Sequence, residues 1–95
     1  MFYLNVWLTV KRDEDIARVG ELLATAQKWS REEPGNRRFE VYHSETDPRR
    51  YLLCEHWETK ADWEAHREAK AFREVYAPQV LPLVDREPHP SQLLD

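Results

Sequence analysis

The side chains best suited to chemistry are concentrated in residues 51–66. This stretch holds two of the four histidines, two of the four tryptophans and the only cysteine. His66 is the leading candidate for a catalytic residue, because a neutral imidazole can remove a phenolic or enolic proton near physiological pH. The competing interpretation is a surface or capping histidine near a helix end. Glu55 is the second catalytic candidate. It is either a buried carboxylate paired with an arginine or histidine, which we favour, or a group that orients His66.

Aromatic side chains supply the candidates for the wall of a substrate pocket. Flat rings favour flat substrates, and a tyrosine phenol can also form a hydrogen bond with a substrate oxygen. In so small a domain, an aromatic residue is more often simply part of the core. The candidate substrate-binding residues are Phe39, Trp57, Trp63, Phe72 and Tyr76.

We expect neither a metal site nor a cofactor. Cys54 and His56 share one face of a predicted strand and His43 lies on the neighbouring strand, but no pair of ligands has a recognised metal-binding spacing. The chain has two glycines and no glycine-rich phosphate loop, which argues against a nucleotide or flavin site of the usual type. Four arginines at residues 37–38 and 49–50 could hold a phosphate, although solvated turn positions explain them more simply.

Length and composition predict one small domain. We expect residues 1–95 to fold as a single unit that buries ~60 to 70% of its unfolded surface and gains from self-association. The net charge is −4, with acidic and basic residues mixed along the chain, so no surface for nucleic acid or an anionic membrane is predicted. A single cysteine forms no internal disulfide, and no apolar run is long enough to span a bilayer. A cytoplasmic location follows as our expectation.

Hydrophobic periodicity predicts the elements that position these side chains. Residues 2–10 are rich in aromatic and β-branched types and form the first strand, with apolar side chains on both faces. A helix capped by Asp13 or Asp15 follows and continues to about Arg31. The segment Glu33-Pro34-Gly35-Asn36 ends this helix, because proline cannot continue the hydrogen-bond ladder and glycine or asparagine accepts a left-handed turn.

The middle of the chain predicts a hairpin and a second helix. A strand at residues 38–44 pairs across a polar turn with a strand at residues 51–58. The second strand is mostly apolar on both faces, as is typical of a central strand. Thr59 is well placed to cap a helix at residues 60–67.

The final third is less regular. A further helical stretch carries Tyr76, and Pro78 and Pro82 must kink or interrupt it. Near the end of the chain, the apolar pair Leu93-Leu94 is our candidate for a brief last strand. The complete order, β-α-β-β-α-β, predicts the α+β class and the ferredoxin-like split βαβ arrangement, a four-stranded antiparallel sheet with helices on one face.

Two features of this sheet matter for function. So short a chain can cover only one sheet face with helices, so the other face, which carries Tyr3 and Trp7, suggests a homodimer interface. The sheet face toward which each side chain of residues 51–58 points then decides which of them line the pocket. If Glu55 and Trp57 face the helices, they approach His66; with the opposite direction, His56 takes their place.

Several segments together are similar to a known family. They are Glu33-Pro34-Gly35-Asn36-Arg37-Arg38-Phe39-Glu40-Val41, Leu53-Cys54-Glu55-His56-Trp57-Glu58 and Trp63-Glu64-Ala65-His66, followed by Phe72. In this order and spacing they resemble the antibiotic biosynthesis monooxygenase family of dimeric α+β barrels. The resemblance covers nearly the whole chain. It implies a homodimer, a pocket between sheet and helices in each subunit and, in several members, cofactor-free oxygenation of quinols, anthrones or related polycyclic phenols.

Two branches of this family offer alternatives. Residues 33–41 look especially like the branch that acts on the phosphorylated autoinducer-2 signal and rearranges a small sugar-like molecule without oxygen. The haem-degrading branch fits less well, because its residues equivalent to His66 and Tyr76 are usually tryptophan and a haem-ligating histidine. We therefore predict a cofactor-independent monooxygenase that oxidises a quinol- or anthrone-like aromatic molecule with O2. The alternatives are an isomerase or degrading enzyme for a small phosphorylated signal, and a non-catalytic dimeric ligand-binding module.

Overall fold

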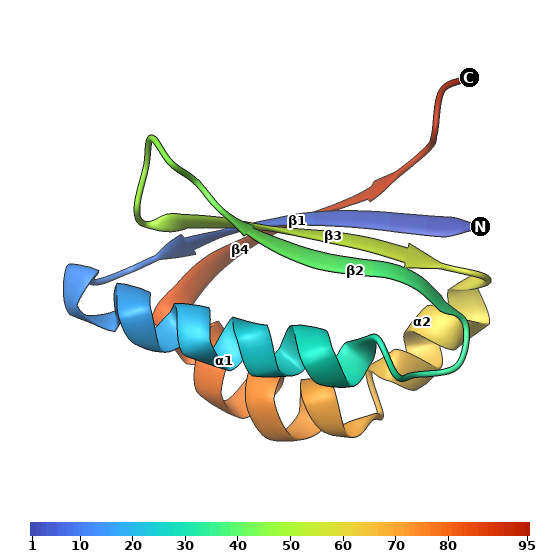
Figure 1. Ribbon diagram of the computed structural model, residues 1–95, viewed down its shortest axis with the longest axis horizontal. Coiled ribbons are helices and arrows are strands. Elements are labelled where there is room, and N and C mark those ends of the chain that lie inside the picture. Colours follow the sequence, from blue (N-terminus) through green and yellow to red (C-terminus); the bar gives the residue numbers. More distant parts are fainter.

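Four antiparallel strands form one sheet, and all the helices lie on one side of it (Figure 1). The computed structural model describes residues 1–95. The arrangement confirms the predicted ferredoxin-like α+β fold. Its elements are β1 (Phe2–Val10), the 3-10 turn η1 (Asp13–Asp15), α1 (Ile16–Ser30), β2 (Asn36–His43), β3 (Arg50–Trp57), α2 (Lys60–His66), the π-helix η2 (Ala71–Val80), the 3-10 turn η3 (Leu81–Leu83) and β4 (Val84–Ser91).

The strand order is β2-β3-β1-β4, so β3 and β1 are the central strands. Glu55 of β3 lies opposite Leu4 of β1 on one side and Phe39 of β2 on the other. Side chains alternate between the sheet faces with a period of two residues. The face that the helices cover, here called the inner face, therefore receives Glu55 and Trp57, whereas His56 points to the opposite, outer face.

The core lies between the inner face and the helices. From Leu4 to Val10 of β1 every second side chain is buried, and the residues between them are half-buried on the outer face. On α1, the buried residues Val19, Leu23 and Ala26 recur at three- and four-residue spacing, which places them along one helix face. Sheet and helix thus bury one apolar face each.

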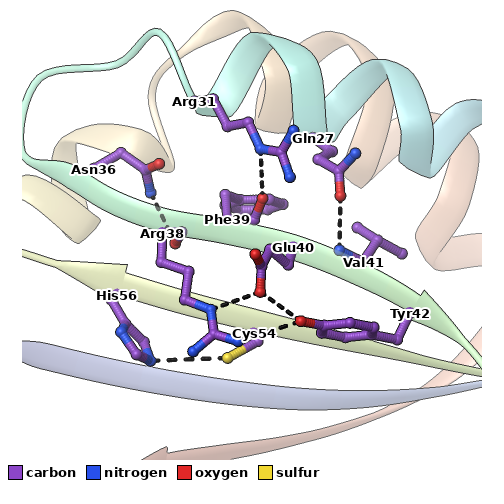
Figure 2. A network of polar contacts seen from close by, with 10 residues as sticks. All are labelled: Gln27, Arg31, Asn36, Arg38, Phe39, Glu40, Val41, Tyr42, Cys54 and His56. Carbon is purple, nitrogen blue, oxygen red and sulfur yellow. Dashed lines mark hydrogen bonds and ion pairs between the residues drawn. The ribbon is translucent and has the colours of Figure 1, made fainter.

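Side chains of α1 and of Arg31, the residue after it, cover the free edge of β2 (Figure 2). Arg31 Nε donates to the Phe39 carbonyl at 2.8 Å, and Gln27 Oε1 accepts from the Val41 N–H at 2.8 Å. An uncovered edge strand would leave these backbone groups open to pairing with another chain. The two contacts also hold Phe39 at the level of Glu55.

The start of α1 differs from the prediction. Asp15 precedes the helix but forms no side-chain capping hydrogen bond. A capping side chain requires an extended backbone, whereas the turn η1 holds Asp15 at φ −98° and ψ −2°. Its carboxylate instead lies 3.9 Å from Arg12 Nε.

The turn between α1 and β2 packs directly against α2. Gly35 has φ +79°, and the Asn36 N–H donates to the Glu33 carbonyl at 3.2 Å. Proline at the second position and glycine with positive φ at the third are the signature of a type II β-turn. A Cβ on Gly35 would lie 2.2 Å from Asp62 Cγ. The Gly35 carbonyl also accepts from the Glu58 N–H at 2.7 Å, so this turn is held close to α2.

The predicted cap of α2 is confirmed. Thr59 has an extended backbone, and its Oγ1 accepts a hydrogen bond from the Asp62 N–H at 3.1 Å. This contact satisfies one of the free N–H groups of the first turn. The cap therefore fixes where the short helix that carries His66 begins.

Of the two prolines predicted to kink or interrupt this helix, Pro78 does not interrupt η2, which continues through it to Val80, whereas η2 ends before Pro82. In a π-helix each N–H reaches the carbonyl five residues earlier, as the Leu81 N–H does to the Tyr76 carbonyl. The wider turn has room for a proline ring that would clash in an α-helix. Pro82 lies at the start of η3, where its missing N–H costs no hydrogen bond.

The last strand also differs from the prediction, which placed it at Leu93-Leu94. The strand is Val84–Ser91, and it pairs antiparallel with β1 although it contains Pro88 and Pro90. Prolines are tolerated on an edge strand when their nitrogens face away from the partner strand. Two prolines spaced two residues apart meet this condition together. Leu93 and Leu94 are exposed beyond the strand.

Substitution of Gly35 by alanine tests how tightly the turn is held against α2. We expect Gly35→Ala to lower the free energy of unfolding by more than ~1–2 kcal/mol, because alanine disfavours positive φ and its Cβ meets Asp62. In an Asp62→Ala background the loss should be smaller, since the contacts with the Asp62 carboxylate are removed, while the backbone penalty and the 2.7 Å contact with the Cβ at position 62 remain. Chemical denaturation of the parent, the two single variants and the double variant measures both quantities. A Gly35→Ala protein within ~0.5 kcal/mol of the parent would contradict this packing.

Candidate active site

A cavity lies between the inner face of the sheet and the helices. Its wall is mostly apolar but includes a carboxyl group, an imidazole, a phenol and a guanidinium. Such a set of few polar groups in an apolar wall is typical of small-molecule sites. The lining residues are Leu4, Leu23, Ala26, Phe39, Leu53, Glu55, Trp63, His66, Phe72, Tyr76 and Arg86.

The cavity is small. The volume open to the centre of a water-sized sphere is about 20 Å³, and one buried water needs ~10–15 Å³ by the same measure. The cavity as it stands therefore has room for about one water. A substrate with an aromatic ring must displace side chains, and the half-buried rings of Trp63 and Phe72 are the least confined of the aromatic lining.

His66 is the last residue of α2 and is 7% exposed. Its Nδ1 lies 2.7 Å from Oε1 of Glu33, which belongs to the turn between α1 and β2. Its ring lies 4.7 Å from the Trp57 ring and 5.8 Å from those of Phe39 and Phe72, measured between centroids. The ring thus meets a carboxylate on one side and aromatic surface on the others.

Glu55 is buried on β3, and its Oε1 accepts a hydrogen bond from Trp57 Nε1 at 3.1 Å. Burial raises the pKa of this carboxyl group, because the charged form loses water. Positive charge on His66, the Trp57 hydrogen bond and the Arg86 guanidinium act in the opposite direction. Burial dominates, so the neutral acid is favoured here relative to an exposed glutamate.

Tyr76 and Arg86 form a second polar pair in the cavity wall. Arg86 Nε, on β4, donates to the Tyr76 hydroxyl, on η2, at 3.1 Å. Burial raises the pKa of Tyr76, and the Arg86 charge opposes this shift. Tyr76 therefore keeps its proton and can donate it in a hydrogen bond to a substrate oxygen.

The structure gathers six of the seven residues that the sequence suggested for the site. The exception is Trp57, which is fully buried behind Glu55 and His66 and does not line the cavity. The six that line it are Phe39, Glu55, Trp63, His66, Phe72 and Tyr76.

Two site residues were missed from the sequence. Glu33 was recognised only as part of a helix-ending turn, although its side chain contacts His66. Arg86 was missed because the last strand was predicted at Leu93-Leu94, whereas β4 is Val84–Ser91. The signal that could have found it is its place two residues after the apolar Val84, on the same side of a strand.

Cys54 and His56 lie on the outer face, away from the cavity. Figure 2 shows both side chains on the opposite side of β2 and β3 from α1, with Cys54 Sγ and His56 Nε2 3.8 Å apart. His43 instead stacks on Tyr51 at 4.2 Å between ring centroids. The three side chains do not converge, and no group of three or more His, Cys, Asp or Glu residues is placed to share a metal ion.

The four arginines near the hairpin do not reach the cavity either. Arg37 pairs with Glu58 at 3.1 Å, and Arg38 pairs with Glu40 at 2.6 Å (Figure 2). The guanidinium of Arg50 lies 4.5 Å from the centre of the Trp7 ring. The lining of the cavity contains one arginine, Arg86.

None of the helices combines the length and the apolar character needed to cross a membrane.

Comparisons with known proteins agree on one family and one fold. The sequence model described as antibiotic biosynthesis monooxygenase matches residues 1–78. A crystal structure described as an antibiotic biosynthesis monooxygenase is similar over 100% of both chains, with a TM-score of 0.90 and 18% identity. A Nitrosomonas europaea protein named for the same family gives a TM-score of 0.86 at 24% identity, over 98% of this chain and 99% of that chain.

A third structure carries a broader description. It is a Bacteroides thetaiotaomicron protein described as a possible oxidoreductase, with a TM-score of 0.88 and 20% identity over 97% of this chain and 96% of that chain. No curated protein matches the sequence. At these identities the structural likeness shows the shared fold.

The raised pKa of Glu55 gives a pH-dependent stability. The folded protein holds this proton to higher pH than the unfolded chain does, so the stabilisation is full below about pH 4.3, the ordinary glutamate pKa. It is lost as the pH rises through the raised pKa of the folded state. We therefore expect Glu55→Gln, which stays neutral, to become more stable relative to the parent as the pH rises from 4 to 8, by about 1.4 kcal/mol for each unit of raised pKa.

Chemical denaturation of both proteins across this pH range measures the difference. Glu64→Gln, on the exposed side of α2, is the control and should show little change with pH. A difference between Glu55→Gln and the parent that stays flat, or that falls as the pH rises, would show that burial does not dominate at Glu55.

Proposed function

Because the chain belongs to the antibiotic biosynthesis monooxygenase family, we propose that it is a cofactor-independent enzyme that oxidises an aromatic small molecule with O2. The substrate class is a quinol, an anthrone or a related phenol. The observation that carries the proposal is the buried imidazole of His66 in the wall of a small, mostly apolar cavity. A base in such a place can form an electron-rich anion from a phenol, and the apolar wall shields this anion from water.

The reaction begins with a proton transfer to His66. Removal of the acidic proton leaves the substrate as an anion, whose electron pair is then available to O2. In an anthrone, one electron passes to O2 and the two radicals join, which forms a carbon–oxygen bond and a peroxide anion. The peroxide takes a proton from the His66 imidazolium. Loss of water from the hydroperoxide gives the new carbonyl, so that CH2 and O2 become C=O and H2O.

The other polar groups act on the charge that develops in the substrate. The Tyr76 hydroxyl can donate to the substrate oxygen, and Arg86 stabilises negative charge beside it. Preorganised donors of this kind stabilise an oxyanion without having to reorient during the reaction. The rings of Phe39, Trp63 and Phe72 supply flat apolar surface against which an aromatic substrate can pack.

A second candidate function has one observation in its favour. An isomerase or degrading enzyme for a small phosphorylated signal needs a cationic group in the pocket, and Arg86 lies in the cavity wall. A guanidinium suits a phosphate oxygen well. The remaining wall is mainly apolar and aromatic, which favours the first proposal. The third alternative, a non-catalytic ligand-binding module, would use the same cavity without proton transfer.

We also propose that the chain acts as a homodimer that associates through the outer sheet face. The helices leave this face uncovered, and the half-buried side chains of Tyr3, Trp7, Leu52 and Cys54 lie on it. Burial of such a surface against a second copy would supply the cover that one chain cannot supply for itself.

Oxygen uptake with a panel of quinols and anthrones, without added metal or flavin, tests the enzymatic proposal. We expect His66→Ala to lower the rate by ~10²–10⁴-fold, the usual contribution of a positioned general base. His89→Ala is the matched control, because His89 lies exposed on β4 and pairs with Glu87. Circular dichroism establishes that each variant is folded.

Equal rates in folded His66→Ala and the parent would remove His66 from the mechanism. Absence of uptake across the panel, together with turnover of a phosphorylated ketose-like compound, would favour the second candidate instead.

Sedimentation velocity at micromolar concentration tests the dimer. We expect the parent to sediment as a dimer and Trp7→Glu to sediment as a monomer, because a charge replaces an aromatic ring in the proposed interface. Glu21→Gln, on the exposed side of α1, should leave the dimer intact. A parent protein that is monomeric at this concentration would overturn the proposed interface.

A further inference from the structure

Glu33 and His66 stand between two separate hollows of the molecule. His66 lines the cavity between sheet and helices, and both residues line a separate outer pocket of about 80 Å³. The side chain of Glu33 is 13% exposed and that of His66 is 7% exposed. The pair therefore has one side toward the candidate substrate site and one side toward surface water.

We propose that Glu33 is the positioning residue for His66. It would hold the ring proton on Nδ1 and so leave Nε2 as the nitrogen that receives the substrate proton. This inference rests on the proposed function of His66 as a base. It follows from one hydrogen bond: an ionised carboxylate accepts and cannot donate, so the Nδ1 atom 2.7 Å from Glu33 Oε1 must carry the proton.

The backbone around Glu33 is fixed well enough for this task. Its N–H donates to the Ser30 carbonyl at 3.1 Å, and its carbonyl accepts from the Asn36 N–H at 3.2 Å. The same turn is held against α2 through Gly35 and Glu58. A carboxylate on such a turn can fix the ring orientation with little loss of conformational freedom when substrate arrives.

The two glutamates near His66 lie in different surroundings and so suit different roles. Glu55 lies in the protein interior, where burial raises its pKa. Glu33 faces the outer pocket, where water can solvate a charged carboxylate. When His66 takes a proton at Nε2, the imidazolium keeps its hydrogen bond to Glu33, and the proton stays available for return to the peroxide. No proton leaves the site during this step.

Several charged or titratable groups surround the His66 ring and bear on how its activity depends on pH. Glu55 faces it from β3, and Tyr76 and Arg86 share the cavity wall from η2 and β4. Among these charged or titratable groups, Glu33 is the one that forms a hydrogen bond with the ring. Replacement of Glu33 by glutamine removes that charge and keeps nearly the same shape.

The position of the His66 ring proton can be measured directly in uniformly ¹⁵N-labelled protein at pH 8. The ¹H–¹⁵N correlation spectra report the two ring nitrogens, and the His66→Gln variant assigns their signals. In the parent we expect the pattern of the Nδ1–H form. In Glu33→Gln we expect a mixture of the two neutral forms or the Nε2–H form. Glu32→Gln, the exposed neighbour, should leave the pattern unchanged. An Nε2–H form in the parent would overturn the positioning role, whatever the activity.

Oxygen uptake as a function of pH supplies the second readout. In Glu33→Gln we expect the rate to fall by roughly 10²- to 10⁴-fold. The acid side of the pH profile should also move to lower pH, because the protonated ring loses its negative partner. Glu33→Asp keeps the charge and should recover part of the rate. An unmoved profile in Glu33→Gln would overturn the positioning role.

The two readouts separate this inference from the proposed function. An Nδ1–H form that depends on Glu33, in a protein without oxygen uptake, would support the pairing and contradict the monooxygenase proposal. Oxygen uptake that requires His66 but does not change in Glu33→Gln would support the monooxygenase proposal and contradict the positioning role of Glu33.

Discussion

The two-residue period of β3 is the constraint on which the candidate site depends. This strand lies between β2 and β1 and is paired on both edges. Its register therefore cannot shift without breaking two sets of hydrogen bonds. Its pairing places Glu55 and Trp57 under the helices and Cys54 and His56 on the outer face. A slip of one residue would exchange the two sets and give the cavity a thiol and a different histidine. The row that joins Leu4, Glu55 and Phe39 across three strands fixes this choice.

Much of this fold could be predicted from local patterns. The period of β1, the glycine turn at residues 33–36 and the Thr59 cap each depend on neighbouring residues alone, and the structure agrees with them. The errors came where tertiary context overrides a local rule. Pro78 is accommodated in a π-helix, and Pro88 and Pro90 are tolerated because β4 is an edge strand. Asp15 failed as a cap because the preceding turn holds its backbone in a helical conformation.

The site was predictable in its residue types and less so in its contacts. Glu55 and His66 were proposed from the sequence, but the hydrogen bond between His66 and Glu33 joins residues 33 positions apart. Such a contact follows from how the turn packs on α2, which no local pattern encodes. Arg86 lines the cavity from β4, a strand that was not predicted at this place because it contains two prolines. The resulting set, an imidazole backed by a carboxylate and a phenol beside a guanidinium in an apolar wall, suits proton removal from a flat phenolic molecule.

The proposed function requires the cavity beneath the sheet to receive the aromatic substrate, although it now has room for about one water. The most direct measurement is a titration of ¹⁵N,¹³C-labelled protein with a hydroquinone under anaerobic conditions, so that binding is observed without turnover. We expect saturable chemical-shift changes at His66, Tyr76 and Phe39. We also expect large changes at the rings of Trp63 and Phe72, which must move aside. Changes confined to Cys54, His56 and the rest of the outer face, or no saturable change in a protein that consumes oxygen with the same compound, would contradict it.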